Sequence, residues 1–352
     1  MAKYWSKLVE SLDPYVPGEQ PQDQQYIKLN TNESPYPPAP AVAQVLKSFD
    51  PDRLRRYPDP QSGQLVQALA DYHDLDPRQV FVGNGSDEVL AHAFQAFFKQ
   101  DEAILFPDIS YSFYPVYCSL YQIAFETVAL DADFRIDFDG FRRANGGIII
   151  PNPNAPTGIA LKLAEIREML ADNPESVVII DEAYVDFGAE SARSLIDEFE
   201  NLLVVQTYSK SRNLAGLRLG FALGNENLIE ALQRVKNSFN SYPIDSLTSA
   251  IGLAALADEA YFQDCNRRVI ENRERLAVAL GELDFEVFPS SANFVFTRHR
   301  QCAAETLYLE LKTAGILVRY FRKARIDDCL RISIGTETEC EKLIGALKTI
   351  LG

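Results

Sequence analysis

Short apolar runs alternate with amphipathic segments through the first two thirds of the chain. The runs at 80–83, 103–106, 147–150, 177–180 and 202–205 read like fully buried strands of a parallel sheet. Between them, apolar residues recur at helical spacing, as they do over 63–72, 86–97 and 161–173. This alternation predicts an α/β unit in which helices flank a mostly parallel sheet.

The pattern changes beyond Phe221. Helices are expected at 227–236, 246–256, 260–283, 303–314 and 339–351, and short strands at 285–288, 293–296, 316–320 and 330–334. This predicts a smaller α+β unit, whereas the proline-rich start of the chain predicts an extended arm. We therefore expect an N-terminal arm that forms part of the small domain (1–45), a large domain (46–242) and a small C-terminal domain (243–352).

Composition narrows the range of partners. The 352 residues carry a formal net charge of -16, which disfavours binding to nucleic acid or to an anionic membrane. No apolar run approaches membrane-spanning length, and the first residues lack the apolar core of a signal peptide. We expect a soluble enzyme with small-molecule substrates, and no nucleic-acid or membrane partner.

Cysteine and histidine usage points to a reducing compartment without a metal site. The five cysteines are scattered and form no close pair, which is typical of reduced thiols in the cytoplasm. None of the three histidines has a second histidine or a cysteine at ligand spacing, so we expect no metal.

Two candidate reactive groups follow predicted buried strands. Lys210 comes just after the run 202–205, where open α/β sheets bind their ligands, and Thr207 and Ser209 surround it with hydroxyls. Asp181 directly follows the run 177–180, where a carboxylate is costly unless it has a partner. A functional acid competes here with a satisfied structural carboxylate or a helix cap.

Further loops offer sites for an anion and a ring. Gly85, Ser86 and Asp87 open a helix whose free N–H groups and dipole favour an anion, although a plain N-cap has the same sequence. Arg218 adds a guanidinium, and Tyr111, after the run 103–106, could cover a planar ligand. Pyridoxal phosphate needs this combination of lysine, acid, aromatic and anion site.

The chain resembles the fold-type I pyridoxal-phosphate aminotransferases and, among them, the histidinol-phosphate aminotransferase branch. The resemblance extends over nearly the whole chain. It is carried by LDPYVPG, LNTNESPYPP, RRYPDP, NGSDE, PNPNAPTG, IIDEAY, YSKSRNLAGLRLG and CLRISIGT. The family fold implies a large domain with a mostly parallel sheet flanked by helices, plus a smaller α+β domain.

The resemblance implies a role for each matching residue. Lys210 would be the Schiff-base lysine, Asp181 would pair with the pyridine nitrogen, and Tyr184 would hydrogen-bond the phenolic oxygen of the ring. Tyr57 would reach the cofactor phosphate of the neighbouring subunit, which implies a homodimer. The remaining cofactor contacts expected are Gly85, Ser86, Asp87, Tyr111, Thr207, Ser209 and Arg218.

One position departs from the family pattern. The family loop often has asparagine immediately before Pro-Thr-Gly, in contact with the phenolic oxygen, and this chain has Ala155 there. We assign that contact to Asn154, one residue earlier.

The implied reaction is a pair of half-reactions at one site. Glutamate donates its amine and leaves as 2-oxoglutarate, and the amine passes to imidazole-acetol phosphate to give histidinol phosphate, or the reverse. Arg331 would bind the acidic group of the substrate, with Arg319, Tyr15 and Asn32 as further substrate contacts. An aromatic amino-acid aminotransferase or a decarboxylase on the same loops are alternatives within the class, and a catalytically silent binding protein is an alternative outside it.

Overall fold

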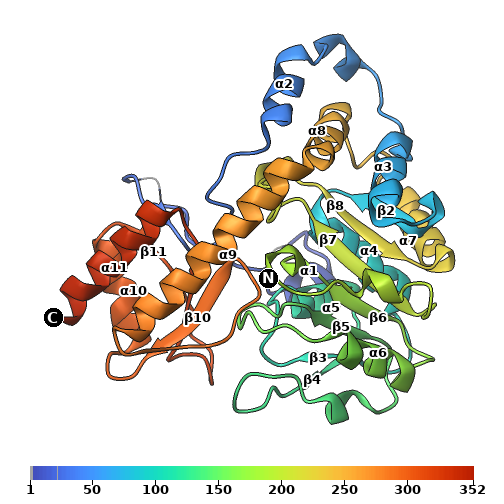
Figure 1. Cartoon of the computed structure of the whole chain (residues 1–352). Coiled ribbons are helices and arrows are strands. Elements are labelled where there is room, and N and C mark those ends of the chain that lie inside the picture. The colour runs from blue at the N-terminus through green and yellow to red at the C-terminus, as the bar shows by residue number, and fades with distance from the viewer. Residues whose placement is uncertain (1–2, 22) are drawn as a thin grey trace.

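The computed structural model describes residues 3–21 and 23–352 (Figure 1). The large unit is built on a seven-stranded sheet in the order β2-β8-β7-β6-β5-β3-β4. β8 runs antiparallel to both β2 and β7, and every other pairing is parallel. The strands are β2 (Val80–Gly83), β3 (Ile104–Pro107), β4 (Phe125–Val128), β5 (Ile148–Pro151), β6 (Val178–Asp181), β7 (Leu202–Thr207) and β8 (Gly220–Gly224).

Helices cover both faces of this sheet, which explains why its central strands are apolar throughout. In β6, Val178 and Ile180 pack into one hydrophobic cluster and Ile179 packs into the other. The first face is covered by α3 (Gly63–His73), α6 (Leu163–Asp172) and α8 (Ser246–Ala257). The second face is covered by α4 (Gly85–Phe97), α5 (Tyr114–Tyr121) and α7 (Glu226–Phe239). The predicted α/β architecture is therefore confirmed.

Some elements of the large unit carry no clear apolar pattern and were not anticipated. β4 lies at the edge of the sheet, and its first three residues are exposed, so no apolar run marks it. β8 is bounded by glycines, and α2 (Pro40–Ser48) begins within the expected arm and continues past its end at residue 45. Short 3-10 helices occupy Pro51–Arg55, Pro77–Gln79, Phe138–Phe141, Val185–Phe187, Ala192–Leu195 and Ala215–Leu217.

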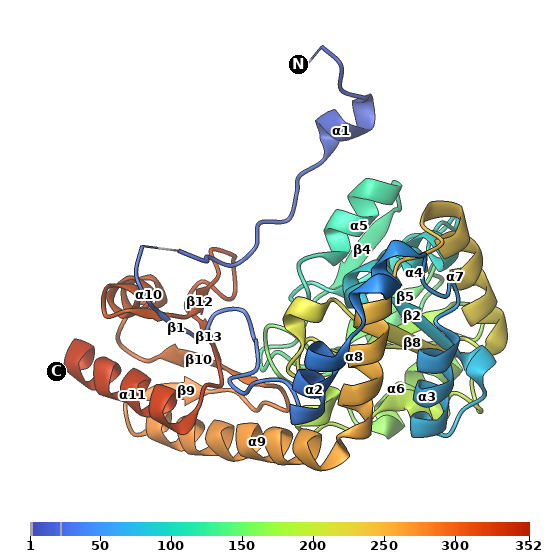
Figure 2. The ribbon, with the colours of Figure 1, turned by 90° about the horizontal axis from the view of Figure 1, so that it is seen from above.

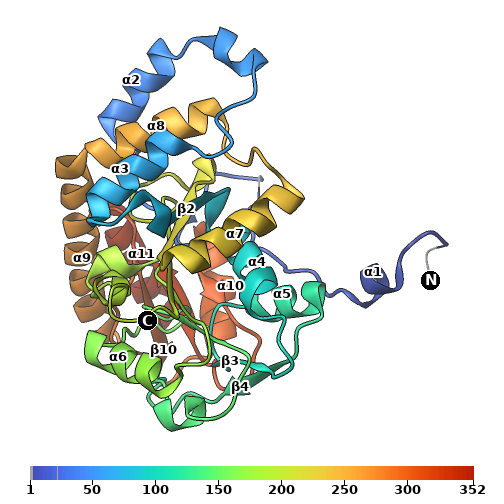
Figure 3. The ribbon, with the colours of Figure 1, turned by 90° about the vertical axis from the view of Figure 1, so that its right-hand side faces the viewer.

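The small unit holds an antiparallel sheet in the order β12-β13-β10-β9. Its elements are β9 (Phe285–Val287), β10 (Phe294–His299), α10 (Ala304–Thr313), β11 (Ile316–Leu317), β12 (Arg319–Tyr320), β13 (Leu330–Ser333) and α11 (Glu337–Leu351). The arm joins this unit, because β1 (Ile27–Lys28) pairs in parallel with β11. Before β1, the short helix α1 (Lys7–Ser11) stands away from the rest of the chain (Figures 2 and 3).

The division between the two units differs from the expected boundary at 242/243. Ile251 and Leu256 of α8 belong to the core of the large sheet, whereas Val269 and Leu276 of the long helix α9 (Glu259–Gly281) belong to the core of the small unit. The apolar faces of the helices therefore place the boundary within α9, which runs from one unit to the other (Figure 2). The polar loop near 242 suggested a boundary only because packing partners are invisible in the sequence.

The strand directions bring five loops to one edge of the sheet. β2 and β7 are both antiparallel to β8 and so point the same way, and β3, β5 and β6 are parallel to β7 through their shared pairings. The loops that follow β2, β3, β5, β6 and β7 therefore meet at the carboxyl edge, where α/β sheets bind ligands. None of the helices within 3–21 and 23–352 combines the length and the apolar character needed to span a bilayer.

We expect Gly220→Ala to destabilise the protein. A Cβ at Gly220 would lie 2.3 Å from the backbone nitrogen of Ser86, so the start of α4 would have to move away from β8. We expect a loss of about 1–3 kcal/mol in the free energy of unfolding, measured by urea denaturation. Gly216→Ala is the matched control, because nothing lies within 4 Å of its Cβ position. Equal stabilities for the two variants would contradict this description of the packing.

Candidate active site

A cavity of about 290 Å³ opens at the carboxyl edge of the large sheet. All five loops contribute to its walls, and the N-terminal arm adds Thr31 and Glu33. Most of the residues expected at the cofactor lie in these walls: Ser86, Asp87, Tyr111, Asp181, Tyr184, Thr207, Ser209, Lys210 and Arg218. The fold thus brings together side chains that are far apart in the sequence.

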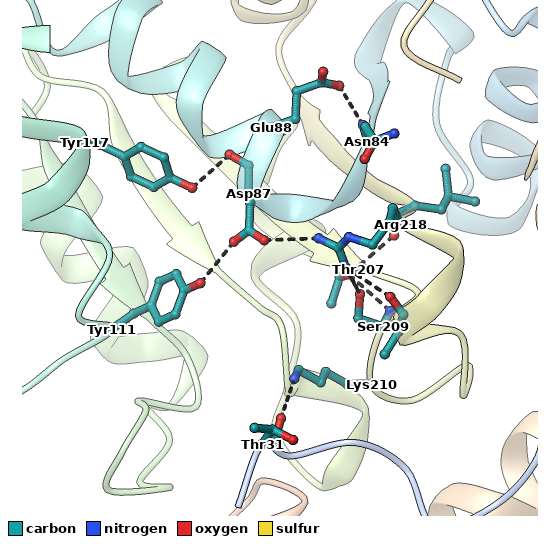
Figure 4. A network of polar contacts seen from close by, with 12 residues as sticks. Thr31, Asn84, Asp87, Glu88, Tyr111, Tyr117, Thr207, Ser209, Lys210 and Arg218 are labelled. Atoms are coloured by element: carbon teal, nitrogen blue, oxygen red, sulfur yellow. Dashed lines mark hydrogen bonds and ion pairs between the residues drawn. The ribbon is translucent and has the colours of Figure 1, made fainter. Parts of the chain in front are cut away.

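Lys210 places its amine in this cavity. The residue follows the end of β7 and is half-buried. Its Nζ donates a hydrogen bond of 3.2 Å to the backbone oxygen of Thr31 (Figure 4). The same nitrogen lies 5.6 Å from the centre of the Tyr184 ring. The amine therefore lies between the arm and the loop after β6.

Asp181 is the last residue of β6, and its carboxyl is buried. Oδ2 accepts a hydrogen bond of 2.9 Å from the Tyr114 hydroxyl, whereas Oδ1 is buried without a hydrogen-bond partner. Burial raises the pKa of Asp181 to about 6, against the opposing effect of the Tyr114 hydroxyl. A buried carboxyl oxygen that lacks a partner in a cavity wall fits the protonated nitrogen of a heterocyclic ring.

Glu182, the residue after Asp181, points away from the cavity, because successive residues of an extended chain point to opposite faces. Glu182 accepts hydrogen bonds from the Ser191 hydroxyl, the Ala192 backbone N–H and the Gln206 amide. Burial raises the pKa of Glu182 to about 7. Glu182 is therefore a satisfied structural carboxyl, and Asp181 is the acid that lines the cavity.

One end of the cavity is suited to a phosphate. Asp87 lies in the first turn of α4, and its Oδ2 is 3.1 Å from Arg218 Nη2. Arg218 Nη1 donates to the Ser209 hydroxyl at 3.2 Å, and the Thr207 hydroxyl lies 3.0 Å from that of Ser209 (Figure 4). A helix N-terminus, a guanidinium and two hydroxyls together form a cradle for an anion.

Gly85 keeps this cradle open. Its φ of +79° falls in the left-handed region, and a Cβ there would lie 2.4 Å from Arg218 Nη2. Any side chain at this position would therefore push the guanidinium away from the helix start. Gly85 acts through its lack of a side chain, whereas the hydroxyl of Tyr111 contacts the cradle directly by donating to Asp87 Oδ1 at 3.0 Å.

Asn154 lies elsewhere than expected. Its Nδ2 donates to the Ile109 backbone oxygen and to the Thr157 hydroxyl, both at 3.0 Å, and Ala155 takes its place in the cavity wall. Two backbone hydrogen bonds, to Ile159 and from Gly158, fold the loop so that Asn154 points inward. The structure therefore does not bring this amide to the cavity, which corrects our assignment of Asn154 to the phenolic oxygen.

Two of the residues expected at the substrate form a pair of arginines. Arg319 of β12 and Arg331 of β13 are direct cross-strand partners. Arg331 Nη2 donates to the Asn30 backbone oxygen at 3.0 Å, its Nε has no partner, and burial lowers its pKa. Like charges placed opposite each other repel, so this pair favours an anion bound between them.

The remaining predicted residues lie in three different surroundings. The ring of Tyr15 packs 5.1 Å from that of Phe113, on the Tyr111 loop. The amide of Asn32 donates to the Tyr184 hydroxyl, so it reaches the cavity only through that residue. Tyr57 is 83% exposed and stacks 4.7 Å from Tyr242, so it is not brought to the cavity within one chain.

The sequence reasoning missed three contributors. Tyr114, which bonds Asp181, is the first residue of α5 and follows Tyr111 closely enough that it could have been proposed from that position. Thr31 and Glu33 reach the cavity because the arm is held by the pairing of β1 with β11, which no local pattern reveals.

The chain is similar to known proteins of one enzyme family. The sequence profile of the family described as aminotransferase class I and II matches residues 24–347. The chain is 57% identical over 351 residues to histidinol-phosphate aminotransferase 1 of Hydrogenovibrio crunogenus, covering 100% of this chain and 99% of that protein. It is also 57% identical to the histidinol-phosphate aminotransferase of Chromohalobacter salexigens, covering 99% of each.

A solved structure shares the fold. The crystal structure of histidinol-phosphate aminotransferase from Sinorhizobium meliloti, in complex with pyridoxal-5'-phosphate, matches with a TM-score of 0.89. The match covers 99% of this chain and 98% of that one, at 24% identity. The fold-type I architecture is therefore confirmed.

The buried carboxyl of Asp181 predicts a pH-dependent stability of the ligand-free protein. The pKa of Asp181 is about 6 in the folded state, against an ordinary value of 3.8, so the folded state holds a proton that the unfolded chain loses. Stability must therefore fall as the pH rises from about 4 to 6. Asp181→Asn cannot ionise, and should raise the free energy of unfolding at pH 7 by about 1–3 kcal/mol.

Urea unfolding of parent and variant at pH 4 and pH 7 tests this expectation. The comparison between the two proteins removes the separate titration of Glu182. The gain should disappear at pH 4, and equal stabilities at pH 7 would show that the carboxyl is not strained by burial.

Proposed function

The chain belongs to the class I and II aminotransferases, and from this membership we propose that it interconverts histidinol phosphate and imidazole-acetol phosphate, with 2-oxoglutarate and glutamate as the second pair. The observation that carries this proposal is the cavity that unites Lys210, the unpartnered oxygen of Asp181 and the cradle at Arg218. The full-length relatives named as histidinol-phosphate aminotransferases support the choice of substrate. The chain is thus an enzyme of histidine biosynthesis that uses pyridoxal 5'-phosphate.

The residues of the cavity match the parts of this cofactor. Bound there, pyridoxal phosphate supplies an aldehyde that exchanges amines and a ring that takes up an electron pair. Asp181 Oδ1 would hold the protonated ring nitrogen, which satisfies the oxygen that otherwise lacks a partner. Arg218, Ser209 and the N-terminus of α4 would hold the phosphate.

Lys210 has two roles in this proposal. Its Nζ would hold the cofactor through the aldehyde, and once an amine substrate has taken its place, the same nitrogen would move the proton that leaves the substrate Cα. The Thr31 backbone oxygen accepts a hydrogen bond from Nζ, and in the neutral amine this contact would leave the Nζ lone pair free to accept a proton. The lysine therefore acts as base and then as acid without leaving the cavity.

The arginine pair suits the anionic groups of both substrates. Glutamate brings an α-carboxylate and histidinol phosphate brings a phosphate, and the two can occupy the same place at Arg331 in turn. A phosphate carries nearly two charges and three acceptor oxygens, so a second guanidinium from Arg319 favours it over a carboxylate.

A homodimer and a cytoplasmic location complete the proposal. Tyr57 and Tyr242 form an exposed aromatic stack, which supports a subunit contact that would bring Tyr57 to the cofactor phosphate of the neighbouring subunit. The five cysteines are free, which supports a reducing compartment.

Substrate choice can be tested through Arg319. Arg319→Ala should lower kcat/KM for histidinol phosphate by about 10- to 100-fold, the range for losing a charge-assisted hydrogen bond, and affect phenylalanine far less. Arg322→Ala is the matched control, because Arg322 is an exposed arginine paired with Glu305. If the parent enzyme has a higher kcat/KM for phenylalanine or tyrosine than for histidinol phosphate, it is an aromatic amino-acid aminotransferase instead.

Subunit complementation tests the shared site. Tyr57→Phe should weaken cofactor retention, and mixing it with Lys210→Ala should create heterodimers in which one site has both Lys210 and Tyr57 intact. Those sites should retain cofactor as the parent does. The matched control mixes Tyr57→Phe with the double variant Tyr57→Phe/Lys210→Ala, which leaves no intact site. Equal retention in the two mixtures, with heterodimers shown to form, would contradict a site shared between subunits.

A further inference from the structure

The hydroxyl of Tyr184 is held by a residue of the N-terminal arm. Asn32 Nδ2 donates a hydrogen bond of 3.0 Å to the Tyr184 oxygen. Asn32 has no exposed surface, and Tyr184 lines the cavity beside Lys210. Because a tyrosine hydroxyl has a single hydrogen, and its oxygen here accepts from Asn32, that hydrogen is free to point into the cavity.

The orientation of the Asn32 amide is fixed by Ser333. The Ser333 hydroxyl oxygen accepts from the Asn32 backbone N–H at 2.9 Å, and its hydrogen goes to Asn32 Oδ1, also at 2.9 Å. With Oδ1 bound by the serine, Nδ2 is the atom that faces Tyr184. Ser333 thus holds the Asn32 amide at Oδ1 while Nδ2 donates to Tyr184.

The backbone around Asn32 is built for this position. Its φ of +56° lies in the left-handed region, where asparagine is one of the few side chains commonly found. The Asn293 amide donates to the Asn32 backbone oxygen at 2.9 Å and holds it from the other side. Both amide atoms of Asn32 are thus occupied, which leaves none free to bind substrate directly.

We propose that Asn32 is a positioning residue that keeps the hydrogen of the Tyr184 hydroxyl directed at the ring oxygen of the cofactor. This inference rests on the proposed function and deepens it. It replaces the role in substrate binding that the sequence suggested for Asn32. Ala155 presents only a methyl group to the cavity, and Asn154 points away from it, so the loop after β5 leaves the ring oxygen to Tyr184.

The same contacts join the substrate-binding strand to the cofactor site. Ser333 and Arg331 both lie on β13, and Asn32 connects that strand with Tyr184 of the large unit. A shift of β13 when an anion binds at Arg331 would therefore reach Tyr184 through two hydrogen bonds. The arm thus links the site for the anion with the site for the ring.

The experiment is a pH titration of the visible absorbance of the bound cofactor. This absorbance reports the protonation of the nitrogen that would join Lys210 to the cofactor, which is conjugated with the ring oxygen. A hydrogen bond donated to that oxygen stabilises its charged form and lowers the apparent pKa. Asn32→Gly removes the amide and tolerates the positive φ, and Asn32→Asp offers an acceptor that would draw the tyrosine hydrogen away. Both should raise the apparent pKa, by about one unit for Asn32→Asp.

The double variants distinguish positioning from a direct effect. If Asn32 acts through Tyr184, then Asn32→Asp combined with Tyr184→Phe should shift the titration no further than Tyr184→Phe alone. Additive shifts would mean that the new charge acts on the cofactor directly and would overturn the proposal. Ser333→Ala leaves Asn32 in place but frees its amide to turn over, so it should also raise the apparent pKa. This variant provides the test if the Asn32 variants do not fold.

The outcomes for the two proposals are separate. One outcome is that the apparent pKa stays the same in the Asn32 variants while the parent binds the cofactor and transfers amines normally. That result would overturn the role of Asn32 and leave the proposed function standing. A parent protein that binds no pyridoxal phosphate would overturn the proposed function, and the role of Asn32 with it.

Discussion

The carboxyl of Asp181 is held in the protein interior with only one of its oxygens satisfied. Placing it there costs free energy, as its raised pKa shows, and a ligand in the cavity that donates to Oδ1 would supply the missing partner. The carboxyl is buried at the end of β6, where Tyr114 of α5 packs against it. A cationic ring nitrogen relieves the strain, so the fold itself favours binding of the cofactor.

The other parts of the site follow from the direction of the strands. Five loops meet at one edge only because β8 runs antiparallel between β2 and β7 and so keeps those two strands pointing the same way. The close approach of Gly220 to the start of α4 then sets the helix N-terminus beside Arg218. The arm brings Asn32 against Tyr184 of the same cavity, and the arginine pair lies on neighbouring strands of the small unit.

Much of this arrangement could be predicted from the sequence, because buried strands and the polar residues after them leave local patterns. Lys210 and Asp181 were recognisable from their places after apolar runs, and Arg218 from the guanidinium that it adds shortly after Lys210. Contacts set by tertiary packing were not: Asn154 turns inward because of its loop, and α8 joins the large core through a face that its sequence does not assign to either unit. The contact of Asn32 with Tyr184 depends on a backbone of positive φ and on Ser333 from β13, which no single stretch encodes.

The most direct test of this account is to locate the lysine that carries the cofactor. The protein with bound pyridoxal phosphate would be reduced with borohydride, digested, and the labelled peptide identified by mass spectrometry. The account predicts a label on Lys210 alone, because its amine lies in the cavity beside Tyr184. A label on Lys162, at the start of α6, or on Lys236, whose Nζ donates to the Pro60 backbone oxygen, would contradict it.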